Sequence, residues 1–72
     1  MSTRGRVWRV RKVYRHIDAE IDDAGQPSGV ELRILYSGRV IYSRRWETRA
    51  LAEADAQAKL TQLERAGWTS HW

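Results

Sequence analysis

Four side chains that can bind metal ions or transfer protons alternate along residues 16–22. They are His16, Asp18, Glu20 and Asp22. Alternate residues of a strand share one face and lie about 7 Å apart, whereas hard cations usually take their ligands from loops that wrap around the ion. We therefore interpret this set as the polar face of a strand whose other face carries Ile17, Ala19 and Ile21, and we predict no metal site.

The residue types of a hydrolytic triad are present, but they do not form a recognisable catalytic motif. No serine lies in a nucleophile elbow or a glycine-rich turn. The isolated Gly5 and Gly38 do not make a phosphate-binding loop. The sequence therefore predicts a protein that is not an enzyme, with no cofactor and no small-molecule substrate.

The charged residues are separated into blocks along the chain. Residues 1–17 contain six basic residues and no acid, residues 18–31 contain five acids and no base, and residues 32–49 contain five arginines and one glutamate. The net charge is +4 and the isoelectric point is near 10.1. The two basic blocks are the candidates for contact with an acidic partner such as nucleic acid.

Arginines in the basic blocks support a first functional prediction, a nucleic-acid-binding module. Arginines on a sheet face can neutralise phosphates and offer paired donors to base edges, and β-ribbons enter the major groove of DNA. The candidates are Arg33, Arg39, Ser43 and Arg45 on the outer face of the sheet, with Arg4, Arg6, Arg9, Arg11 and Lys12 near the N-terminus. The expected partner is double-stranded DNA, and a merely solvated face is the alternative.

Two aliphatic residues among these arginines support a second functional prediction, a protein-interaction or self-associating module. Leu35 and Ile41 would form an apolar centre with a charged rim, as in many protein interfaces. So small a core would also gain stability from pairing. Trp72 is a further candidate anchor for a protein partner.

Length and composition predict one small domain over residues 1–72. A chain of this size is near the lower limit for a fold held by its core alone, and without cysteine it has no disulfide to assist. It has no run of about 18 apolar residues and no apolar segment of the kind found in signal peptides. We expect a cytoplasmic protein without a membrane partner.

Alternating apolar residues predict an antiparallel sheet over residues 7–46, after a mobile basic arm over residues 1–6. Trp8 and Val10 differ in parity from Ile17, so we expect a bulge or break near Arg11 and Lys12. Turn-forming residues at positions 22–29 are expected to close the first hairpin. The sheet has three strands, or four if the residues around Trp8 form one of their own.

The turn at residues 36–38 permits two registers for the hairpin over residues 31–46. A two-residue loop would mix arginines into both faces. A three-residue loop with a left-handed Gly38 separates them better, and because burying unpaired charge is costly we choose it. The inner face is then Val30, Leu32, Ile34, Val40, Tyr42 and Trp46, and the outer face Glu31, Arg33, Leu35, Arg39, Ile41, Ser43 and Arg45. By alternation Arg44 joins the inner face and must extend outward at the end of the sheet.

One amphipathic helix is predicted over residues 49–66, followed by a tail over residues 69–72. Thr48 is its expected N-cap and Gly67 its stop, with Trp68 against Leu63. Its apolar stripe is Ala52, Ala56, Leu60, Leu63 and Ala66. Because this stripe is rich in alanine, the sheet must supply the large side chains of the core, namely Ile17, Leu32, Ile34, Tyr42 and Trp46. The fold class is therefore α+β, with β-β-β-α order.

The segment that opens the helix carries a family resemblance. Trp46, one spacer, the Thr48 cap and the following alanines, in the order of three strands and a helix, resemble the AP2-like arm-binding domains of phage and transposon integrases. The resemblance covers roughly residues 30–66. It implies that the sheet face away from the helix, with Arg33, Arg39, Ser43 and Arg45, lies in the DNA major groove. The chain also resembles short bacterial proteins of unknown function that end in a helix followed by Gly-Trp.

Overall fold

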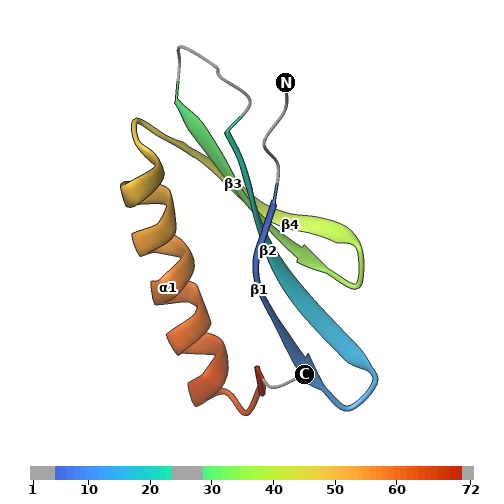
Figure 1. The fold of residues 1–72 in the computed structure, drawn as a ribbon. Coiled ribbons are helices and arrows are strands. Elements are labelled where there is room, and N and C mark those ends of the chain that lie inside the picture. Colours follow the sequence, from blue (N-terminus) through green and yellow to red (C-terminus); the bar gives the residue numbers. More distant parts are fainter. Residues whose placement is uncertain (1–4, 24–28, 71–72) are drawn as a thin grey trace.

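Four antiparallel strands form one sheet, and one helix lies across a single face of it (Figure 1). The computed structural model describes residues 5–23 and 29–70. The strands are β1 (Gly5–Lys12), β2 (Arg15–Asp22), β3 (Val30–Tyr36) and β4 (Arg39–Trp46), and they lie side by side in chain order. The helix α1 spans Arg49–Arg65. The α+β class is confirmed, and the residues around Trp8 form the fourth strand.

The first hairpin is formed by β1 and β2, and its turn is the break that the change of parity predicted. It is closed by the two residues Val13 and Tyr14, directly after the expected break near Lys12. A bulge that was not predicted lies at Val7, where the register between β1 and β2 shifts. Residues 23–29 join β2 to its antiparallel neighbour β3, as the turn-forming residues there predicted, and 24–28 lie outside the described part. Because β1 begins at Gly5, Arg6 belongs to the sheet and not to the predicted arm.

The second hairpin has a two-residue turn, so the predicted three-residue loop is wrong. Ser37 and Gly38 both have positive φ, 48° and 89°, as a tight mirror-image turn requires. Arg39 pairs with Tyr36 and Val40 with Leu35, and Ile41 is then the extra residue of a bulge. Beyond the bulge the residues face the predicted sides, although the pairing differs, with Tyr42 opposite Ile34. Arg39 therefore lies on the helix side of the sheet and Val40 on the outer side, each the reverse of the prediction.

The core lies between α1 and the inner face of the sheet. The sheet supplies the larger buried side chains, and the helix supplies only two alanines that let it approach closely. The buried apolar residues are Val10, Ile17, Ala19, Ile21, Val30, Leu32 and Ile34 from the strands, and Ala52 and Ala56 from the helix. Trp8, Tyr42, Trp46, Leu60 and Leu63 pack around them. This division of large and small side chains confirms the prediction.

Both ends of the helix follow the predicted signals. The hydroxyl of Thr48 accepts a hydrogen bond from the Leu51 amide at 3.2 Å. Ala66 is the C-cap, and Gly67 follows with a φ of 98°. The Trp68 amide then donates to the Leu63 carbonyl at 3.0 Å, which is the 6→1 bond of a Schellman ending. This ending turns the chain back toward β1.

Candidate nucleic-acid interface

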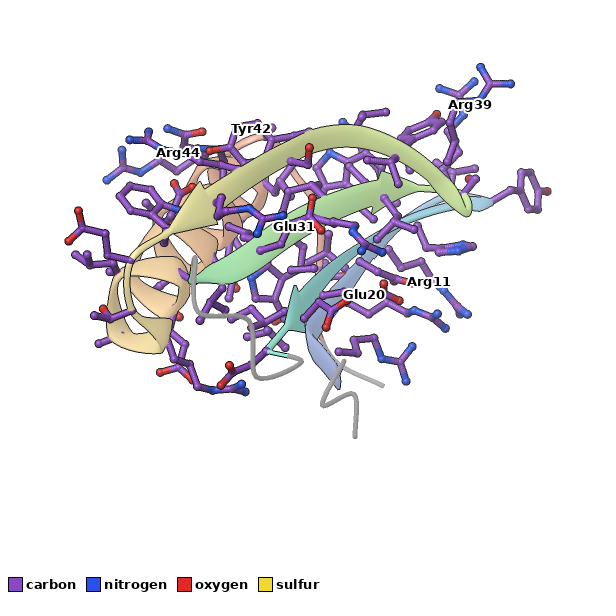
Figure 2. All side chains as sticks on the ribbon, turned by 90° about the horizontal axis from the view of Figure 1, so that it is seen from above. Arg11, Glu20, Glu31, Arg39, Tyr42 and Arg44 are labelled. Carbon is purple, nitrogen blue, oxygen red and sulfur yellow. The ribbon has the colours of Figure 1, made fainter. Side chains whose placement is uncertain are left out.

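On the outer face of the sheet, acids and arginines of neighbouring strands lie opposite one another. Cross-strand neighbours pair Arg6 with Glu20 and Arg9 with Asp18, and Glu20 in turn lies opposite Arg33. Glu31 lies opposite Arg45, and Figure 2 shows Glu20 and Glu31 on adjacent strands. The predicted basic face therefore has the acidic strand β2 at its centre, because the acidic block of the sequence folds between the two basic blocks.

Two of the predicted DNA-binding arginines are held by acids of this face. The guanidinium of Arg9 donates to both carboxylate oxygens of Asp18, one at 2.8 Å. Arg33 donates to Glu31 at 2.9 Å and lies 3.5 Å from Asp22. A phosphate would have to compete with these carboxylates. These ion pairs also give partners to Asp18 and Asp22, two of the four alternating side chains of residues 16–22.

The remaining predicted residues do not gather at one site. Ser43 and Arg45 lie with Arg33 on the outer face, whereas Arg39 lies at the turn end of β4, far from Arg44 (Figure 2). Arg44 is exposed as predicted, with its guanidinium carbon 3.9 Å from the centre of the Trp46 ring. Arg4 and Trp72 lie outside the described residues.

Basic residues instead gather where both hairpins turn and the helix ends, a region we call the hairpin end (residues 11–16, 36–40 and 65–70). Antiparallel order places the two turns at the same end of the sheet, and α1 finishes beside the first of them (Figure 1). These segments contain no acid, and the neighbouring acid is Glu64, which precedes Arg65 and accepts a hydrogen bond from the Ser70 hydroxyl at 3.3 Å. The basic residues of these segments are Arg11, Lys12, Arg15, Arg39 and Arg65.

The tip of the first hairpin exposes two apolar residues at the centre of this basic region. Tyr14 is 97% exposed and Val13 is 79% exposed. Val13 also has a φ of 57°, which is a true outlier for a β-branched residue. Backbone strain of this kind is often kept where it presents a contact residue. Sequence analysis missed Val13, Tyr14 and Arg15, although the change of parity near Lys12 was a signal that the chain turns there.

Hydrogen bonds fasten the segment after the helix to the first hairpin. Thr69 and Arg11 exchange both backbone hydrogen bonds, at 2.7 and 3.0 Å. The amine of Lys12 donates to the Ala66 carbonyl at 2.9 Å, and the Trp68 ring meets Tyr36 edge-on at 6.4 Å. A pocket of about 370 Å³ lies between hairpin and segment, lined by Lys12, Val13, Tyr14, Arg15 and Trp68.

The apolar residues of the second functional prediction lie together at the β3–β4 turn. Leu35 is partly buried and faces Val40, which is 49% exposed. Ile41, the bulge residue, is 56% exposed. The patch therefore gains Val40, which sequence analysis assigned to the core. It borders the edge of β4.

A polar cluster joins β4 to the helix. The Tyr42 hydroxyl donates to Asp55 at 2.7 Å, and Lys59 donates to the same carboxylate at 3.0 Å. Partial burial opposes ionisation of Asp55, but these two hydrogen bonds and the charge of Lys59 outweigh it and hold the pKa of Asp55 below its usual value. The bond to Asp55 raises the pKa of Tyr42 and that of Lys59.

Residues 5–23 and 29–70 contain neither a metal-binding cluster nor a membrane-spanning helix. No three His, Cys, Asp or Glu side chains of these residues cluster where they could hold a metal ion. None of the helices described is long and apolar enough to cross a membrane. Comparisons of the chain with family models, curated proteins and solved structures find no match.

Proposed function

We propose that this chain is a non-enzymatic nucleic-acid-binding module, acting in the cytoplasm, whose contact surface is the hairpin end. The observation that carries the proposal is the exposed Tyr14 among basic residues in segments that contain no acid. Phosphate binding is driven by cations that release counterions, and an aromatic ring adds a surface on which a base can stack. The outer face is less suited, because its arginines lie among carboxylates.

Two double variants with the same change in charge test where on the protein nucleic acid binds. Arg15→Gln with Arg39→Gln removes two cations from the hairpin end, and Arg33→Gln with Arg45→Gln removes two from the outer face. We expect the first pair to weaken oligonucleotide binding at low salt and to lower the slope of log K against log salt by roughly 0.7–0.9 for each lost phosphate contact. We expect the second pair to leave the affinity and the salt slope unchanged. Thermal melts show whether each variant is folded.

Fluorescence anisotropy with duplex and single-stranded oligonucleotides at several salt concentrations gives the readout. Loss of binding only in the variant of Arg33 and Arg45 would place the interface on the outer face and contradict its assignment to the hairpin end. No binding of wild-type protein to any oligonucleotide at low salt would overturn the function itself.

The apolar patch of Leu35, Val40 and Ile41 supports a second candidate, self-association or binding of another protein. It combines two half-exposed aliphatic residues with the edge of β4, and exposed strand edges readily pair with other chains. Light scattering with about 0.5 M salt, where screening acts within about 4 Å, separates the two candidates. Apolar pairing should survive this salt and be lost in Leu35→Ser with Ile41→Ser, whereas phosphate binding should not survive it.

A further inference from the structure

The pocket at the hairpin end combines the two chemistries that a single nucleotide requires. Its walls include an indole and a phenol, from Trp68 and Tyr14, together with the cationic side chains of Lys12 and Arg15. Aromatic faces stack on bases, and the cations neutralise the phosphates on either side. Its volume of about 370 Å³ falls in the usual range of small-ligand sites, about 300–1,000 Å³.

One wall of the pocket is preorganised. Trp68 is held by its backbone bond to Leu63 and by the Tyr36 ring, and the following residue, Thr69, is paired with Arg11. Lys12 is held by one bond to the Ala66 carbonyl, and an ammonium group has three donors, so two remain for a phosphate. Groups that are already fixed lose little freedom on binding.

The other wall of the pocket is formed by Tyr14, which is exposed to solvent at the tip of the strained turn. Tyr14 is almost fully exposed, so its ring can close on a base that enters beside Trp68. The stacked and paired bases of a duplex present no free face to such a pocket, whereas bases of a single strand do.

We propose that this pocket takes one unstacked base of a single-stranded nucleic acid, with the adjacent phosphates on Lys12 and Arg15. This inference rests on the proposed function, because it deepens the role of the hairpin end from general phosphate binding to selection of single strands. Recognition of this kind tolerates any base, since every base has a π-face.

Three ligands of equal length test the proposal by anisotropy: a thymidine decamer, the same decamer with abasic sites, and a ten-base-pair duplex. We expect the decamer to bind more tightly than the other two at matched salt. Tyr14→Ala should weaken decamer binding by roughly five- to 150-fold, the loss of one stacking contact. It should leave abasic and duplex binding, and the salt slope of all three, unchanged.

Tyr14→Phe and Tyr14→Leu are the matched controls at the same exposed position. Phenylalanine keeps the ring and should retain decamer binding, while leucine keeps an apolar side chain without a π-face and should behave as alanine. In an NMR titration the indole N–H signal of Trp68, assigned through Trp68→Phe, should move with the decamer and stay in place with the abasic strand.

The outcomes separate this inference from the function on which it rests. Equal binding of decamer and abasic strand, or an unaltered decamer affinity in Tyr14→Ala, would overturn the base pocket while leaving phosphate binding by the hairpin end intact. Absence of binding to all three ligands would overturn both.

Discussion

Tyr42 on the edge strand β4 and Asp55 on the helix are joined by a 2.7 Å hydrogen bond. Lys59 completes this contact from one helical turn further on, with its amine 4.6 Å from the centre of the Tyr42 ring. The edge strand has one neighbour in the sheet, β3. The Tyr42–Asp55 bond is therefore a second attachment of β4 to the rest of the fold.

Loss of this bond should destabilise the protein measurably. Tyr42→Phe keeps the ring against the core and removes only the hydroxyl, so Asp55 loses a donor. A hydrogen bond to a charged group contributes about 1.5–3 kcal/mol, and partial exposure places the expected loss near the lower value. Urea unfolding measures it. An unchanged midpoint in Tyr42→Phe would show that the hydroxyl contributes nothing.

The pH dependence of stability should follow from the same cluster, first on the acid side. Because the pKa of Asp55 is lower in the folded state, the unfolded chain binds more protons in acid, and its stability falls as the pH drops below about 4. Asp55→Asn has no such proton to bind. We expect its urea midpoint to change less than that of the wild type between pH 5 and pH 2.5.

On the alkaline side, stability changes with pH in the opposite direction. The pKa values of Tyr42 and Lys59 are raised in the folded state, so the folded chain keeps protons that the unfolded chain releases above about pH 10. Stability should fall as the pH rises through this range. A wild type whose midpoint is constant from pH 9 to pH 11 would contradict the prediction.

Close packing of the helix on the sheet should make its small buried residues intolerant of larger ones. Ala56 is buried, and its carbonyl accepts a 2.9 Å bond from the Trp8 indole, whereas Ala54 is exposed on the same helix. Ala56→Leu should therefore lower the free energy of unfolding by about 1–3 kcal/mol. Ala54→Leu is the matched control and should have almost no effect on the thermal melt.

Gly29 should be irreplaceable for a different reason. Its φ is 111°, and a Cβ atom there would lie 2.1 Å from the Trp46 carbonyl oxygen. Gly29→Ala must therefore shift the backbone where β3 meets the end of β4. We expect a loss of at least about 1–3 kcal/mol, measured by urea unfolding, while Gly5→Ala, whose Cβ meets nothing within 4 Å, should be tolerated.

The alternation of apolar residues was sufficient to predict most of the fold. Ile17, Ala19 and Ile21 face the helix as expected, and Thr48 and Gly67 bound it. The registers near the turns were not predictable in the same way. A two-residue turn followed by a bulge at Ile41 gives the same inward and outward alternation further along as a three-residue loop does, so the pattern beyond the bulge fits both.

The candidate site was less predictable because it depends on which strands become neighbours. The charge blocks were visible in the sequence, but only the strand order shows that β2 brings Asp18 and Glu20 between the arginines of β1 and β3. Likewise Trp68 and Tyr14 lie 54 positions apart in the chain, and they meet at one pocket because the Schellman ending returns the chain to β1.

Strain at the tip of the first hairpin gives the last prediction. Val13 has a left-handed φ of 57°, which costs a non-glycine residue about 1–3 kcal/mol. Glycine at this position relieves the strain but has more freedom in the unfolded chain, an opposing effect of about 0.5–1 kcal/mol. Val13→Gly should therefore raise the free energy of unfolding by about 1 kcal/mol. Tyr14→Gly relieves no left-handed strain and should lower the stability instead, so a pair of melts distinguishes the two positions. If Val13→Gly were as destabilising as Tyr14→Gly, the contacts of the Val13 side chain would outweigh the strain of its backbone. The Val13 side chain is largely exposed, so we expect these contacts to contribute little.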